Sequence, residues 1–149
     1  MFVTSATAET VPSCHGFETL LRVATREVRR GSRPEFSLSV RNTSVTTLRL
    51  LDTRGHRRRD LGDTYYSLVV RTRDGKEPDI MRAISDPGPI ADEDFVTIAP
   101  GERMHISVAT PLALETLERG AYKAHVVVWV DPYDLRSRCR SDDVAFRVQ

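Results

Sequence analysis

Apolar and polar residues alternate over much of this chain, which is the pattern of a β-strand that buries one face and exposes the other. The alternation is clearest in residues 35–42, where Phe36, Leu38 and Val40 share the face that we expect in the core. Residues 17–23 repeat the pattern near the N-terminus. Six further strands are predicted at residues 45–51, 65–71, 95–98, 104–109, 121–130 and 144–148.

Turn-forming and polar residues separate these segments. Asp74-Gly75 is typical of a hairpin turn, and three prolines within residues 77–93 predict an irregular segment. We expect residues 52–64, which are mostly polar, to form a loop. Seven or more short strands between such turns predict an all-β protein, an immunoglobulin-like Greek-key β-sandwich.

Length and charge limit the classes of partner. The 149 residues are enough for one domain with its own core, which we expect at residues 17–149 behind a flexible N-terminal arm, residues 1–16. Net charge is +1, from 22 basic and 21 acidic residues, which gives no general attraction for nucleic acid or an anionic membrane. No apolar run approaches the roughly 20 residues that span a bilayer. Neither nucleic acid nor membrane is therefore expected as a partner.

The sequence does not decide the cellular compartment of the protein. Residues 1–7 lack the basic and apolar regions of a signal peptide, which leaves secretion and a cytoplasmic location both open. Cys14 and Cys139 lie near opposite ends of the chain. They can form one disulfide in an oxidising compartment or stay as two thiols in the cytosol.

A tyrosine near the start of the longest predicted strand has a recognisable local setting. Leu117 and Gly120 precede Tyr122, and the glycine allows the turn into the strand. In a tyrosine corner the phenol bonds to backbone a few residues upstream and holds a Greek-key crossover in place. We predict this structural role for Tyr122, against the alternative of an ordinary core tyrosine.

Short motifs between about Phe36 and Val128 occur in an order that matches one known family. They are Val40-Arg41-Asn42-Thr43, Leu50-Leu51-Asp52-Thr53, Asp74-Gly75-Lys76, the run from Asp94 to Glu102, and Leu117 with Gly120 and Tyr122. In these motifs the chain resembles the immunoglobulin-like accessory domain that precedes the catalytic domain in deuterolysin-type and peptidyl-Lys zinc metalloendopeptidases. The resemblance implies an accessory or binding domain and no peptidase activity.

No residue constellation predicts a catalytic, cofactor or metal site. A zinc peptidase needs two histidines one helical turn apart with a glutamate as base. The four histidines have no such spacing: His15, His56, His105 and His125. Strand parity turns His105 and His125 outward, and we expect both as surface histidines on opposite sheets.

Parity along residues 121–130 also leaves an unusual outer face. We predict that this strand lies between the 45–51 strand and the final strand, which would gather apolar and basic side chains into one interaction surface. Its members would be Trp129, Val127, His125, Leu51, Arg49 and Arg147. The alternative is that the N-terminal arm or the 53–64 loop covers Trp129.

Three functions are compatible with these patterns. The first is a non-catalytic module that binds another protein or domain, or a second copy of itself, without a cofactor. The second is a proteinase inhibitor that presents the loop at 53–64 or at 77–93. The third is a small enzyme with a pocket between the sheets, although the inward positions hold no carboxylate or histidine.

Overall fold

The computed structural model describes residues 11–54, 59–78, 89–131 and 134–149. Within them most of the regular secondary structure is β-strand, with one short α-helix and three 3-10 helices. The elements are, in chain order, β1 (Phe17–Val23), β2 (Glu27–Val28), β3 (Phe36–Asn42), β4 (Leu48–Leu51), α1 (Arg59–Tyr65), β5 (Tyr66–Thr72), η1 (Asp92–Asp94), β6 (Phe95–Ile98), β7 (Arg103–Ser107), η2 (Leu112–Thr116), β8 (Gly120–Trp129), η3 (Leu135–Ser137), β9 (Arg138–Arg140) and β10 (Val144–Val148).

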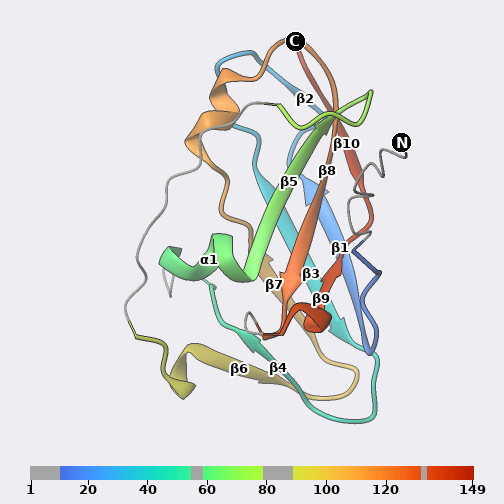
Figure 1. Ribbon diagram of the computed structural model, residues 1–149, viewed down its shortest axis with the longest axis vertical. Helices are drawn as coiled ribbons and strands as arrows, with labels where there is room; N and C mark the ends of the chain where they lie inside the picture. Colours follow the sequence, from blue (N-terminus) through green and yellow to red (C-terminus); the bar gives the residue numbers. More distant parts are fainter. Residues whose placement is uncertain (1–10, 55–58, 79–88, 132–133) are drawn as a thin grey trace, which may run out of the picture.

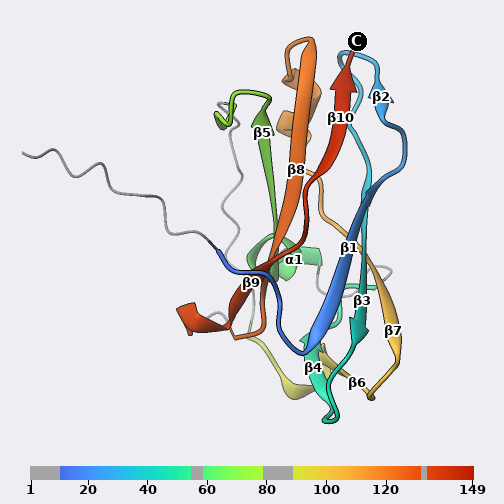
Figure 2. The same ribbon diagram turned by 90° about the vertical axis from the view of Figure 1, so that its right-hand side faces the viewer.

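Two sheets pack face to face, and a small ribbon extends one end of the molecule. The larger sheet has the strand order β2-β10-β8-β5, with β9 also paired to β8. The second sheet has the order β1-β3-β7, and β4 pairs with β6. In Figure 1, β5 and β8 cross in front of β3, and the β4–β6 ribbon lies at the end away from the C-terminus. Figure 2 shows the same arrangement from the side. The predicted all-β sandwich of seven or more strands is confirmed.

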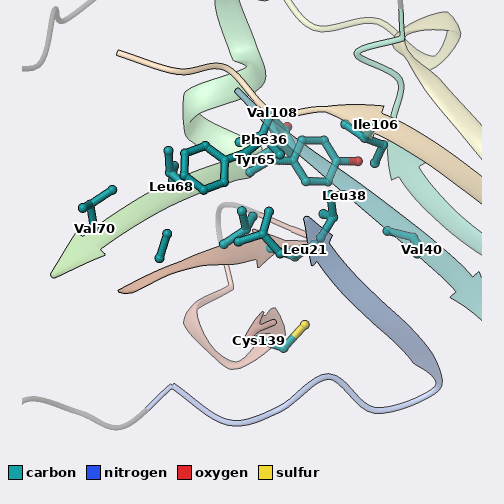
Figure 3. Packing of buried hydrophobic residues seen from close by; sticks show 14 of the residues in the cluster. Leu21, Phe36, Leu38, Val40, Tyr65, Leu68, Val70, Ile106, Val108 and Cys139 are labelled. Atoms are coloured by element: carbon teal, nitrogen blue, oxygen red, sulfur yellow. The ribbon is translucent and has the colours of Figure 1, made fainter. Parts of the chain in front are cut away.

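The core lies between the two sheets, on the faces that the alternation predicts. From the smaller sheet Phe36, Leu38 and Val40 are buried, and from β8 the predicted inward residues Tyr122, Ala124, Val126 and Val128 are buried. Figure 3 shows Leu21 and Leu38 together with Leu68 of the opposite sheet in one interior. Burying such side chains stabilises the fold by roughly 1.5–3 kcal/mol each. The rings of Phe36 and Phe146, 5.7 Å apart, join the two sheets near the C-terminal end.

A sharp corner separates the main sandwich from the β4–β6 ribbon, and Asn42 lies at its centre. Asn42 is completely buried, and its Nδ2 donates to the carbonyls of Thr46 and Ile98, both at 2.8 Å. Its Oδ1 accepts from the backbone N–H of Ser44 at 3.0 Å and from the hydroxyl of Ser44 at 2.8 Å. One side chain therefore ties together the two chain segments that turn at this corner.

The prediction for residues 45–64 was wrong in two places. The strand predicted at residues 45–51 begins only at Leu48, and Val45 before it is 94% exposed. This strand, β4, pairs with β6 instead of β8. The end of the predicted loop is the helix α1, which packs against β5. Leu61 and Tyr65 are four residues apart, which places them on one helical face, and both are buried. Residues 55–58 lie outside the described residues.

Tyr122 makes the hydrogen bond predicted for it. Its hydroxyl donates to the carbonyl oxygen of Glu118, four residues upstream, at 2.6 Å. Gly120 between them has a φ of 151°, which a residue with a side chain rarely adopts. Leu117 is buried just before the turn. The ring of Tyr122 stacks on Phe146, so the same residue anchors both the turn and the core.

We therefore expect Tyr122→Phe to lower the free energy of unfolding by roughly 0.5–1.5 kcal/mol, the usual net value of one hydrogen bond. The phenyl ring keeps the stacking contact, so near-UV circular dichroism should stay close to wild type. Urea denaturation measures the difference, and Tyr122→Leu, which loses the stacking as well, serves as the more damaging comparison. A Tyr122→Phe protein with the wild-type midpoint would make Tyr122 an ordinary core residue.

The described part of the N-terminal arm is attached to the sandwich. Cys14 and Cys139 form a disulfide, with Cα atoms 4.8 Å apart. The backbone N–H of Arg140 donates to the carbonyl of Pro12 at 2.9 Å, and Ser13 forms a β-bridge with Arg140. Residues 12–14 therefore lie along β9, and Gly16 accepts a hydrogen bond from the backbone N–H of Thr43. The prediction of a flexible arm is wrong for these residues because the disulfide and these backbone contacts hold them. Residues 1–10 lie outside the described residues.

Candidate interaction surface

The outer face of the larger sheet carries most of the residues that the sequence singles out. On β8 its members alternate with the core residues: Ala121, Lys123, His125, Val127 and Trp129. Strand β5 lies on one side of β8, with Arg71 opposite Lys123. Strand β10 lies on the other side, with Arg147 opposite Ala121. We refer to this surface as the outer sheet face.

One end of the outer sheet face is hollowed and basic. Small and long side chains alternate there, because Ala121 faces Arg147 and Ala145 faces Lys123 across the β8–β10 pair. The result is an open depression of about 420 Å³, which we call the basic depression. Its exposed cationic lining residues are Arg26, Arg73, Lys123 and Arg147, and Glu27 is the acidic residue beside them.

The cations of the basic depression have no carboxylate within ion-pair distance among the described residues. Other arginines of the outer sheet face do have such a partner. Arg71 lies 3.8 Å from Glu77, and Arg140 lies 2.5 Å from Asp143. The depression therefore concentrates uncompensated positive charge on a chain whose net charge is only +1.

His125 lies on the outer sheet face but is not a surface residue, so that prediction was wrong. Only 5% of it is exposed. Its Nδ1 lies 3.4 Å from Asp143, which is held in turn by Arg140. Parity gave the direction of the side chain correctly. It could not show that Arg140, at the end of β9, and Asp143, in the link to β10, lie close to it.

The environment of His125 disfavours its charged form. Burial lowers the pKa of His125 below its ordinary value, Arg140 and Arg71 lower it further, and Asp143 opposes them. The unfolded chain therefore takes up this proton first as the pH falls through about 6.5. The stability that comes from burying neutral His125 is complete above that pH and is lost as the pH falls toward the folded-state pKa.

Replacing His125 should accordingly flatten the acid side of the stability profile. We expect His125→Asn, whose amide can occupy the position of Nδ1, to lose less stability than wild type between neutral pH and about pH 5. Urea midpoints at a series of pH values measure the slope. His105→Asn is the matched control, because His105 is exposed on β7 and should leave the slope unchanged. Equal slopes in wild type and His125→Asn would contradict the assignment.

The apolar part of the outer sheet face surrounds Trp129. Trp129 is partly buried, and the guanidinium of Arg138, its partner on β9, lies 5.8 Å from the centre of its ring. Val127 beside it is 8% exposed. Neighbouring side chains thus cover part of this surface, and the exposed remainder of Trp129 borders on arginines.

Two members of the predicted surface lie elsewhere. Leu51 is 1% exposed in the core. Arg49 is on the β4–β6 ribbon, where its guanidinium lies 3.8 Å from the ring centre of Phe95 and 3.0 Å from Asp92. Their assignment was wrong because β5, and not β4, is the neighbour of β8. Trp129, Val127, His125 and Arg147 do share the outer sheet face, and β10 is the predicted neighbour.

A second depression lies at the other end of the molecule, beside the disulfide. It has a volume of about 410 Å³ and is lined by apolar residues, hydroxyl groups and two arginines, among them Phe17, Leu48, Ser137, Arg136 and Arg138. His15 is the one histidine in its lining, and no carboxylate lines it. The basic depression contains Glu27 but no histidine. Neither depression therefore brings a histidine and a carboxylate together as an acid–base pair.

The metal-binding possibilities are equally limited in the parts of the chain that the structure describes. No group of three or more His, Cys, Asp and Glu side chains could hold a metal ion there. His105 and His125 lie on different sheets, as predicted. None of the helices in these parts is both long and apolar enough to cross a membrane.

The inhibitor hypothesis used the predicted loops at 53–64 and 77–93. The helix α1 occupies the second half of the first loop. Residues 79–88 of the second loop lie outside the described residues.

Sequence reasoning missed Asn42 and two of the four cations of the basic depression. Asn42 is the chain's single asparagine, and it follows a strand directly, which was the available signal. Lys123 and Arg147 face outward by parity. Arg26 and Arg73 join them only through the pairing of β2 with β10 and of β5 with β8, which the sequence pattern does not reveal.

No protein-family model and no curated protein matches this sequence. The fold is similar to that of Spo0M, a sporulation control protein from Bacillus subtilis, with a TM-score of 0.52 at 11% identity over 91% of this chain. It is also similar to the C-terminal domain of wzt, with a TM-score of 0.53 at 11% identity over 92% of this chain and 75% of that one. This chain spans 50% of the Spo0M chain. At this identity the likeness shows a shared fold alone.

Proposed function

We propose that this protein is a non-catalytic module that binds another protein through its outer sheet face. The observation that carries the proposal is the composition of that face. A partly exposed Trp129 lies beside Val127, and Arg138 and Arg140 of the neighbouring strand β9 pair opposite these two residues. Tryptophan and arginine are the residues most enriched at the centres of protein interfaces.

The architecture supports a binding role of the immunoglobulin-like kind. The order β1-β3-β7 against β10-β8-β5 corresponds to strands A, B and E against strands G, F and C of an immunoglobulin sandwich. The bond from Tyr122 to Glu118 occurs where such sandwiches have their tyrosine corner. An accessory role beside a catalytic unit, as the resemblance to zinc-peptidase accessory domains implies, belongs to the same proposal. In such a role the module binds and another unit does the chemistry.

Site-specific photo-crosslinking in the source cells tests the proposal. A benzophenone amino acid replaces Trp129 in one variant and Ser37 in the other, because Ser37 is exposed on β3 of the opposite sheet. We expect a discrete polypeptide adduct from position 129 and none from position 37. Adducts of the same protein from both positions, or from neither, would contradict binding through the outer sheet face.

A further inference from the structure

We propose that the basic depression binds an acidic segment of a partner protein. Lys123, Arg147, Arg73 and Arg26 would bind its carboxylates, and its backbone would lie over Ala121 and Ala145. This inference rests on the proposed binding function and names the chemistry of the partner at one end of the same face. The shape of the depression, its charge and the burial of its aromatic rings support this partner.

The shape results from two alanines in a region of long side chains. Ala121 and Ala145 are diagonal neighbours on adjacent strands of the β8–β10 pair, and Lys123 and Arg147 occupy the other diagonal. Each alanine ends at Cβ, so the sheet surface between the two long side chains stays low. Adjacent strands lie about 4.8 Å apart. The two alanines therefore form a low strip between the side chains of Lys123 and Arg147, with one basic group on each side of it.

The charge of the depression selects for acidic groups. Four cations and one carboxylate, Glu27, line the depression, which leaves a net positive charge, and none of the four cations has an ion-pair partner among the described residues. Cations gathered in a hollow raise the local positive potential and attract anions. The planar guanidinium of arginine also matches a carboxylate with two parallel hydrogen bonds. Three of the four cations are arginines.

The aromatic residues of the lining argue against a nucleic acid as the ligand. Single-stranded nucleic acids bind by stacking bases on exposed rings. Tyr122 and Phe146 line the depression from below, but they are 6% and 3% exposed and stack on each other in the core. The floor therefore offers methyl groups and backbone, which suit a polypeptide with small apolar residues between its acids.

Fluorescence anisotropy with a short labelled peptide of alternating Glu and Ala tests the inference on the whole chain. We expect binding that weakens with salt, and a Gln-Ala peptide of the same length should not bind. Lys123→Glu/Arg147→Glu should weaken peptide binding about tenfold or more. The matched control is Arg22→Glu/Arg41→Glu, which makes the same charge change at exposed positions of β1 and β3 and should bind like wild type.

A variant without any charge change separates the depression from general attraction. Ala145→Leu fills the floor at an exposed position and should also weaken peptide binding severalfold. Equal binding by Ala145→Leu or by the Lys123→Glu/Arg147→Glu variant and wild type would overturn the site. Oligothymidylate or a sulfated oligosaccharide that binds tighter than the peptide would overturn the partner class. Self-association that these variants abolish would make a second copy the occupant and overturn it too.

The outcome of the crosslinking experiment is independent of this one. A specific adduct at position 129 without peptide binding would leave the binding module intact and reject the acidic partner. Peptide binding that depends on Lys123 and Arg147, without an adduct at position 129, would support the basic depression and restrict the binding surface to its end of the sheet.

Discussion

Reduction of the Cys14–Cys139 disulfide is expected to lower the free energy of unfolding by about 2–5 kcal/mol. The two cysteines are 125 residues apart in sequence, so the bridge closes a loop that includes nearly the whole sandwich. In the chain-entropy model a loop of this length is worth about 5 kcal/mol at most, because the cross-link restricts the unfolded chain. A loss of this size is a large share of the stability of a typical domain.

Urea denaturation with and without a thiol reductant measures this loss. Thiols are counted in the folded protein, so that the bridge is known to be open or closed. The variant Cys14→Ala/Cys139→Ala serves as the control, because its midpoint should not respond to the reductant. An unchanged wild-type midpoint after both thiols have become titratable would show that the bridge contributes little. Residues 11–16 should also lose protection from hydrogen exchange on reduction, because the β-bridge between Ser13 and Arg140 lies next to the disulfide.

Alternation predicted strands well where one face is buried and the other is exposed. Strand β10 begins and ends at the predicted residues, and in β3 the three expected core residues are all buried. The alternation pattern failed where two consecutive residues of a strand are both buried. Leu50 and Leu51 are consecutive residues of β4, and each is 1% exposed. Periodicity of two does not predict two buried neighbours in one strand.

The alternation along a strand predicted the face on which a side chain lies. It did not predict which residues lie beside that side chain or over it. It placed His125, Val127 and Trp129 on one face correctly. The strand next to them is β5, and only long-range pairing decides that. The cover over His125 comes from Arg140 and Asp143 in the link between β9 and β10. A sequence pattern of period two contains no information about such a link.

The basic depression, too, could be predicted from the sequence only in part. The outward direction of Lys123 and Arg147 is evident from their strands, whereas the basic depression exists only because the β8–β10 register sets an alanine opposite each of them. A shift of β10 by one residue in that register would turn Arg147 toward the core. The site is therefore a property of the pairing of two strands, and neither strand contains it alone.

The second large expected effect is at Asn42. We expect Asn42→Asp to lower the free energy of unfolding by about 3–5 kcal/mol, the usual effect of an uncompensated buried charge. In wild type the Nδ2 group donates to the carbonyl oxygens of Thr46 and Ile98. The substitution places a carboxylate oxygen against these two acceptors in a site without solvent exposure. Neither carbonyl can donate, so this oxygen has no partner, while the other carboxylate oxygen keeps only the two donors of Ser44.

A pH series distinguishes this cause from a loss of packing. Protonation gives the new carboxyl group one donor, and burial raises its folded-state pKa above the unfolded value. The Asn42→Asp protein should therefore recover part of its deficit relative to wild type as the pH is lowered toward about 4, measured by urea midpoints. Ser44→Ala, which removes one hydroxyl bonded to Asn42 at an accessible position, should lose only about 1 kcal/mol or less. If Asn42→Asp unfolds at the wild-type midpoint, Asn42 does not hold the corner. If its deficit does not change with pH, the loss comes from packing and not from the two hydrogen bonds.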